Sequence, residues 1–298
     1  MKVTLLGTGS PVPLPDRAGT SILVSIGDER LLFDCGPGTV TRLLENGINP
    51  GSIDRLFFTH HHIDHNAEFF NFAITNWARG NGSETLRIHG PNPWTDTLLE
   101  SLYDIYEEDI EYREEVGYPS NGIWDVETDP VDDGSVIETS RWRVEAREVD
   151  HSIEAYAYRI TDTQTGREVV LSGDTSMCDE IVEIADGADL LVQDCCIAPV
   201  ADDPPTDEDT DAYVWDEYTS ELPDEKRAGL HETHCDPSEA GEIASNAAVD
   251  TVVLTHLLPY RDREAIRSGV AAQFDGDIIV AEDGLEVGVD PIDATTNR

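Results

Sequence analysis

Residues 58–68 read FTHHHIDHNAE and hold four of the nine histidines of the chain. The first two residues of this stretch end an apolar run over residues 55–59, which predicts a buried strand. At its carboxyl end His60 and His62 project from the same side, because side chains repeat every two residues in an extended chain. Two imidazoles on one side can hold one metal ion. An adventitious surface tract is disfavoured, since the strand fixes these residues and an acidic residue interrupts them.

Asp64 and His65 follow where the chain turns into a predicted helix, so they can aim at a neighbouring point. This spacing indicates two metal ions a few ångströms apart, as in two-metal hydrolases. Two ions need further ligands, and three other polar side chains end apolar strands: His151, Asp174 and His256. Each alone is more often an ordinary loop residue, but together they form a consistent set.

The charge balance is extreme. The chain has 298 residues, with 62 acidic and 19 basic side chains and a formal net charge of -43. Such a chain repels itself at low salt, and concentrated salt screens the repulsion. The composition therefore indicates a halophilic protein from a salt-saturated cytoplasm. An acidic protein that recruits basic partners is the alternative, disfavoured because the acids are spread along the chain.

Three absences in the sequence bear on the location of the protein. The sequence has no run of about 18 apolar residues, the length that would predict a membrane span. The first residues, MKVTLLGTGS, lack the apolar region of a signal peptide, so a cytoplasmic protein without membrane partners is expected. The five cysteines show no CxxC spacing, which argues against a disulfide framework or a thiolate metal site.

Strands and helices alternate in two comparable halves, which predicts an α/β fold of two sheets packed face to face with helices outside. Helices are expected at residues 65–78 and 94–106, among others. The segment at about 199–229 is acidic and reads as an insert in a single domain spanning 1–298. It is expected to be either a solvated surface loop or a lid that uses Tyr213, Trp215 and Tyr218.

The motifs HHHIDH, VDHS, SGDT and LTHLLP occur in that order and resemble the metallo-β-lactamase superfamily over nearly the whole chain. LLGTGSPVPLPDRAGTS and LLFDCGPGT are most similar to the branch that holds ribonuclease Z and arylsulfatase-like hydrolases. The resemblance implies a four-layer αββα sandwich of two mixed sheets flanked by helices.

The resemblance also assigns roles to the histidine and aspartate set. One zinc ion would be held by His60, His62 and His151, a second by Asp64, His65 and His256, and Asp174 would bridge them. Two Zn²⁺ are expected, with Mn²⁺ or Fe²⁺ as alternatives. The nucleophile implied is a hydroxide between the metals, which Asp64 would also orient.

A further histidine in the branch contacts the scissile group, and its position here matches His234, a candidate general acid. The alternatives are that His234 only packs beside a helix start, or that His231 takes the role. His61 is expected to point away from the metals. This chain also departs from the branch after the cluster, where Asn66-Ala67-Glu68 replaces an expected glycine.

Ribonuclease Z enzymes usually insert a tRNA-clamping arm between the third histidine motif and the bridging aspartate. Only 22 residues lie between His151 and Asp174 here. A small phosphodiester or sulfate ester is therefore favoured over RNA, with tRNA 3′ processing as the alternative. A non-hydrolytic or diiron redox relative is a further alternative, although redox members usually replace the histidine at position 62 by glutamate. Homodimers are common in this branch.

Overall fold

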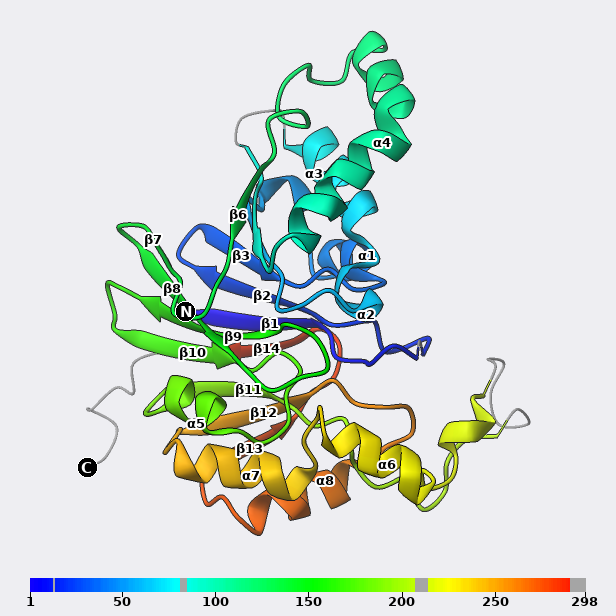
Figure 1. Cartoon of the computed structure of the whole chain (residues 1–298), viewed down its shortest axis with the longest axis vertical. Helices are drawn as coiled ribbons and strands as arrows, with labels where there is room; N and C mark the ends of the chain where they lie inside the picture. Colours follow the sequence, from blue (N-terminus) through cyan, green and yellow to red (C-terminus); the bar gives the residue numbers. More distant parts are fainter. Residues whose placement is uncertain (13, 81–84, 207–213, 290–298) are drawn as a thin grey trace.

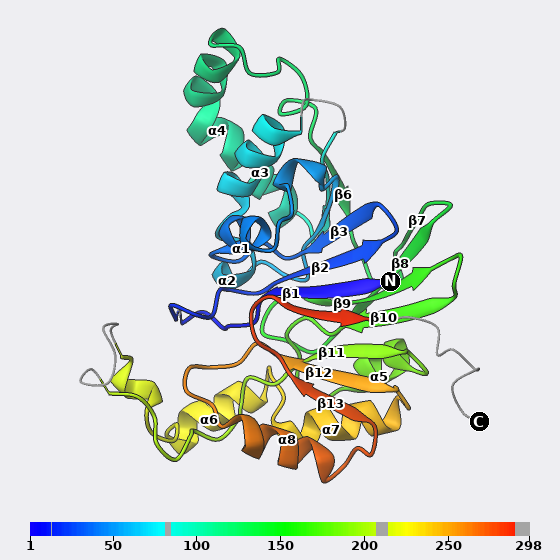
Figure 2. The same ribbon diagram turned by 180° about the vertical axis from the view of Figure 1, so that it is seen from behind.

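The computed structural model describes residues 1–12, 14–80, 85–206 and 214–289. Two seven-stranded sheets pack face to face, and helices cover both outer faces (Figures 1 and 2). Each half of the chain builds one sheet, except that the last strand returns to pair with the first. The expected four-layer αββα architecture is confirmed.

The two sheets mix parallel and antiparallel pairs. The first has the order β14 (Leu285–Gly288), β1 (Lys2–Gly7), β2 (Ser21–Ile26), β3 (Glu29–Phe33), β4 (Arg55–Phe57), β5 (Arg87–Gly90) and β6 (Glu127–Pro130). The second has the order β13 (Asp277–Val280), β12 (Thr251–Thr255), β11 (Leu190–Asp194), β10 (Arg167–Leu171), β9 (Tyr156–Asp162), β8 (Trp142–Glu148) and β7 (Val136–Glu138). Strands β3 and β4 are parallel neighbours, and so are β10, β11 and β12. The loops after these strands therefore meet at one edge.

The helices divide between the two outer faces. The first sheet is covered by α1 (Thr39–Glu45), α2 (Ile63–Asn66), α3 (Phe69–Arg79) and α4 (Trp94–Glu115), and the second by α5 (Asp179–Ala185), α7 (Pro237–Asn246) and α8 (Arg263–Ala271). The 3-10 turns η1 (Pro50–Ser52) and η2 (Asp216–Tyr218) and helix α6 (Asp224–His231) complete the elements. Helix α4 extends past the expected 94–106 because residues 107–115 are rich in glutamate, a strong helix former. Within the described ranges, no helix is long and apolar enough to cross a membrane.

Buried aromatic rings join the two sheets. Phe33 and Phe57 of the first sheet stack with ring centroids 4.8 Å apart, and Tyr158 of the second packs edge-on against Phe57. The Tyr158 hydroxyl donates to the Phe58 carbonyl oxygen at 2.7 Å, so its polar end is satisfied. Burial of one such ring stabilises the fold by about 1.5–3 kcal/mol. These contacts fix the second sheet against the strand that leads into the histidine cluster.

The single helix expected over residues 65–78 is wrong in detail, because the chain forms α2 and α3 with a break at Ala67 and Glu68. The Cys35 N–H donates to the His65 carbonyl at 2.6 Å, and the Glu68 N–H donates to the Cys35 carbonyl at 3.0 Å. The loop after β3 therefore hydrogen-bonds to backbone groups that a continuous helix would pair internally. These bonds also fix the position of the histidine turn.

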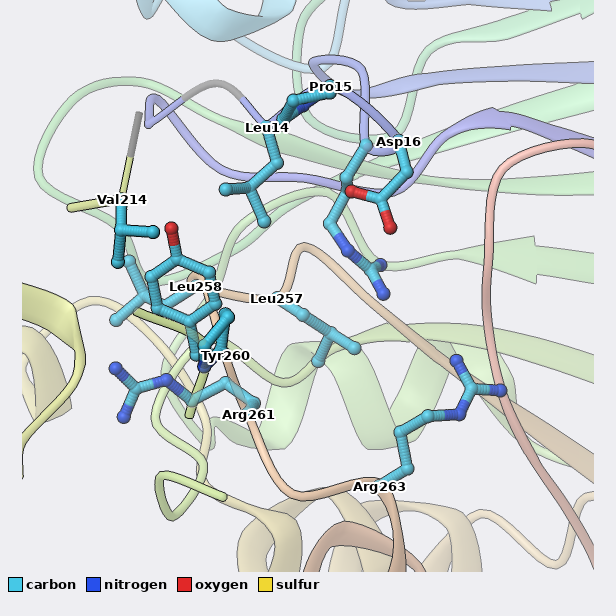
Figure 3. Close-up of a pocket in the computed structure, with 11 residues that line it drawn as sticks. Leu14, Pro15, Asp16, Val214, Leu257, Leu258, Tyr260, Arg261 and Arg263 are labelled. Carbon is cyan, nitrogen blue, oxygen red and sulfur yellow. The ribbon is translucent and has the colours of Figure 1, made fainter. Parts of the chain in front are cut away.

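Most described residues of the insert are exposed, and two of its side chains anchor it to the body. Tyr218 and Leu222 are buried in a cluster with Cys196 and Leu258. Arg261 is also buried and donates to three backbone carbonyls, one of them that of Tyr218. Figure 3 shows Arg261 at the edge of a cavity of about 440 Å³ that lies between the insert and residues 14–17. Tyr213 lies outside the described residues.

Gly36 is a position in the β3 loop where the histidine turn leaves no room for a side chain. A Cβ there would lie 2.0 Å from the Asp64 carbonyl oxygen. Gly36→Ala is therefore expected to lower the free energy of unfolding by about 1–3 kcal/mol or more, the usual cost of overpacking. Chemical denaturation in molar KCl measures the change.

The matched control is Gly229→Ala in α6, where a Cβ meets nothing within 4 Å. This variant should be unchanged or stabilised by about 0.5–1 kcal/mol, because alanine favours a helix over glycine. Equal stability of Gly36→Ala and the natural chain would contradict the packing described here.

Candidate metal centre

Four of the predicted ligands form a first group at the end of β4 and its neighbours. His60 Nε2 and His62 Nδ1 lie 3.1 Å apart, and His62 Nδ1 lies 3.2 Å from His151 Nε2. Asp174 completes this group, in which one candidate ligand atom of each residue lies within 4.8 Å of the others. His60 and Asp174 are buried whereas His62 and His151 are half-buried, so the group is accessible from one side.

The other three predicted ligands, Asp64, His65 and His256, form a second group of the same compactness. Asp174 stands between the groups. Its Oδ2 lies 3.2 Å from both His65 Nε2 and His256 Nε2, and 3.7 Å from His60 Nε2. One carboxylate oxygen therefore faces both groups, which is the position a bridging ligand needs.

Hydrogen bonds around the groups set which ring nitrogen turns inward. The Thr59 hydroxyl donates to Asp34 Oδ2 at 2.8 Å, since a carboxylate only accepts, and therefore accepts from His60 Nδ1 at 3.0 Å. His65 Nδ1 likewise donates to Asp34 Oδ2 at 2.8 Å. When each ring is neutral, its lone pair is then on Nε2, which faces the centre. The hydrogen-bond partners of metal-binding histidines usually orient the ring in this way.

Asp194 and the segment after α6 position the remaining imidazoles. His151 Nδ1 donates to the Thr233 carbonyl at 2.9 Å, and His234 Nδ1 donates to Asp194 Oδ2 at 2.8 Å. The other Asp194 oxygen lies 3.3 Å from His256 Nδ1. Burial alone lowers the pKa of His234, but Asp194 outweighs it and raises that pKa. Asp194 thus orients a candidate ligand and the candidate general acid together.

Negative charge is concentrated in this centre. Four buried carboxylates converge there, those of Asp34, Asp64, Asp174 and Asp194. In the part of the chain that is described, their ion-pair partners are all histidines and none is arginine or lysine. Burial alone lowers the pKa of His65, yet Asp174 and Asp34 raise it to about 10. A centre of this kind needs cations to offset buried negative charge.

The donor atoms fit divalent metal ions. Ligands at about 2.0–2.1 Å around one tetrahedral ion lie roughly 3.3 Å apart, and the nitrogen pairs of the first group are separated by 3.1 and 3.2 Å. His65 Nε2 is buried and makes no well-aligned hydrogen bond, although Asp174 Oδ2 lies 3.2 Å away. A bound ion would give this nitrogen a partner. Imidazole and carboxylate donors together suit Zn²⁺, Mn²⁺ or Fe²⁺.

Two histidines singled out in the sequence lie outside these groups. His61 Nε2 is 2.9 Å from Thr95 Oγ1, so the ring turns away from the centre as expected. His231 lies 3.4 Å from Glu239, whose carboxylate already caps α7, and it is not among the residues around Asp174. His234 is therefore the better placed of the two general-acid candidates.

Three residues that support the centre were not predicted: Asp34, Thr59 and Asp194. Two of them could have been predicted as the ligands were, from polar side chains at strand ends, because Asp34 follows β3 and Asp194 ends β11. Asp34 and His256 also have φ of 59° and 57°. Residues other than glycine rarely adopt this left-handed conformation, and it concentrates at functional sites. Backbone conformation of this kind is not visible in the sequence.

Comparison with known proteins places this centre in a family. The profile described as Anti-Pycsar protein Apyc1 matches residues 1–203, about two thirds of the chain, so the chain belongs to that family. Ribonuclease Z from Mycobacterium bovis is 30% identical, over 98% of this chain and 99% of the relative. The chain belongs to the ribonuclease Z-like branch of the metallo-β-lactamase superfamily. Ribonuclease Z from Mycolicibacterium gilvum is also 30% identical, over 98% and 97% of the two chains.

Solved structures agree on the fold of this superfamily member. The metallo-β-lactamase fold protein YhfI from Bacillus subtilis superposes with a TM-score of 0.70 at 23% identity, covering 96% of this chain and 98% of that one. The short form of human tRNase Z gives a TM-score of 0.69 at 21% identity, covering 98% and 100%. At these identities the likeness establishes the fold alone.

Asp34→Asn tests the supporting hydrogen bonds. Asp34 accepts from His65 Nδ1 and the Thr59 hydroxyl at Oδ2, and from the Thr59 N–H at Oδ1. An amide has only one accepting oxygen and cannot serve both sides, so the affinity for Zn²⁺ is expected to fall about 10- to 100-fold, as for other outer-shell partners of metal ligands. Competition with a chromophoric chelator measures the affinity. Asp109→Asn, which removes an exposed carboxylate on α4, should leave it unchanged. Equal affinities in the two variants would show that Asp34 does not support the centre.

Proposed function

We propose that this chain is a metal-dependent hydrolase of small phosphodiesters that uses two divalent ions, most simply Zn²⁺. The observation that carries the proposal is the single Asp174 oxygen facing both ligand groups. One ion would be held by His60, His62 and His151, and the other by Asp64, His65 and His256. Asp174 would bind both ions. Ions held there would supply a water nucleophile that ionises near neutral pH, and positive charge for the ester oxygens.

Two side chains of the centre would act on protons and on the attacking water. Asp64 Oδ2 lies 3.2 Å from His256 Nε2, at the edge of the second group, where a carboxylate can orient the water. His234 uses Nδ1 on Asp194, which leaves Nε2 to donate a proton to the leaving oxygen. The His234 side chain is 11% exposed, so it is reachable from the open side of the centre.

The segment between His151 and Asp174 favours a small substrate. It is filled by β9, β10 and their tight turn, which leaves no length for a tRNA-clamping arm. The net charge of -43 opposes the many phosphate contacts on which RNA binding depends, but concentrated salt screens this repulsion, so the short segment carries more weight. A sulfate ester has the same tetrahedral shape and is the alternative small substrate.

Ribonuclease Z activity is the second candidate, because relatives of that name match almost the full chain at 30% identity. One set of assays in molar KCl separates the candidates. Hydrolysis of bis-p-nitrophenyl phosphate supports the proposal, hydrolysis of p-nitrophenyl sulfate alone indicates a sulfatase, and cleavage of a tRNA precursor at its 3′ end indicates ribonuclease Z. Bound iron without turnover would point to a redox relative.

Asp174→Ala tests the bridging role. The variant is expected to lose binding of the ion pair and phosphodiester hydrolysis together, because both groups lose the same oxygen. Elemental analysis gives the metal content, and circular dichroism checks that the chain still folds. A variant that keeps full activity with one ion would contradict the proposal.

His234→Ala tests the proton donor. Metal content should be intact, while turnover of a diester with an alkoxide leaving group falls about 10²- to 10⁴-fold, the usual contribution of a general acid. The loss should be smaller for p-nitrophenolate, which departs without a proton. His231→Ala is the matched control and should hydrolyse at the natural rate. An unchanged rate for His234→Ala would remove this assignment.

A further inference from the structure

A cavity of about 460 Å³ adjoins the metal centre on the side of His62. Its walls are mainly apolar and come from Phe70 of α3, Trp94 and Leu98 of α4, and Ile153. Trp94 and Ile153 are 59% and 39% exposed, which is unusual for large apolar side chains that face one hollow. The cavity therefore offers an accessible apolar surface beside the candidate reaction centre.

The chain connects this cavity directly to two candidate ligands. His62 belongs to the first ligand group and also to the cavity wall, since its Nδ1 faces His60 and His151 while its ring lines the cavity. Ile153 lies two residues after His151, in the loop that joins β8 to β9. A group attached to an ester at the metals would thus reach the cavity without crossing another element.

The chemistry of the lining selects for an uncharged group. Among the described residues, no arginine or lysine lines the cavity, so a second phosphate has no cation to meet there. The one carboxylate, that of Glu154, already accepts from the Tyr156 hydroxyl at 2.7 Å. Asn66 stands at the polar side with its Nδ2 3.2 Å from His61 Nδ1. Asn66 is also one of the residues at which this chain departs from its branch.

We infer that this cavity is the subsite for a planar, uncharged ring of the ester, and that the Trp94 indole determines specificity by stacking on it. The inference rests on the proposed function and adds a specificity-determining residue, Trp94, for phosphodiesters that carry a nucleobase or an aryl group. Stacking on an exposed indole suits both, because every such ring has a π face. A charged substituent finds no partner among the described lining residues, and an aliphatic one gains burial but no stacking on the indole.

Two diesters with the same leaving group test the inference and separate the two sources of the ring. Thymidine 5′-p-nitrophenyl phosphate carries a nucleobase on the retained side, and ethyl p-nitrophenyl phosphate does not. If the cavity holds the nucleobase, Trp94→Ala lowers kcat/KM for the thymidine diester only, by about 10-fold or more, the usual range for a lost stacking contact. If it holds the leaving aryl group, both diesters lose about equally.

Tyr112→Ala is the matched control, because Tyr112 is an aromatic residue on the same helix with 61% exposure and does not line the cavity. It should hydrolyse both diesters at the natural rate, and Ile153→Ala should follow Trp94→Ala with a smaller loss. If Trp94→Ala leaves kcat/KM unchanged for both diesters, the inference is overturned while the proposed function stands. If the natural chain hydrolyses neither diester, the proposed function fails and the inference with it.

Discussion

The centre depends on burying four carboxylates where the ends of the two sheets meet, and among the described residues no arginine or lysine pairs with them. Asp174 is the critical member, because its Oδ2 faces imidazoles from both groups. Unpaired buried charge is strongly destabilising, so such a cluster persists only where cations are bound or imidazoles are protonated. Outer hydrogen bonds hold His60, His65 and His151 in place to receive metal ions.

The fold supplies the rest by geometry. Parallel neighbours β10, β11 and β12 deliver Asp174, Asp194 and His256 to one edge, while β3 and β4 deliver the opposing residues from the other sheet. The Tyr158 hydroxyl bound to the Phe58 carbonyl fixes the distance between the sheets next to the cluster. The same arrangement leaves the loop after His151 and the start of α4 free to shape the adjoining cavity.

The sequence alone predicted the seven residues that converge, because five are polar side chains at the ends of apolar strands, two follow at the next helix start, and the motifs resemble one branch of a superfamily. It did not predict the break between α2 and α3, which arises from hydrogen bonds to Cys35, distant in the chain. The burial of Tyr218, a residue of the acidic insert, was not predicted for a related reason. Composition shows the charge of a segment but not the apolar surface that it covers.

The most direct test of the account is anomalous diffraction from crystals of the protein loaded with Zn²⁺. The account predicts two peaks within metal-ligand distance of Asp174, one beside His60, His62 and His151 and the other beside Asp64, His65 and His256. A single peak, or peaks remote from Asp174, would contradict it.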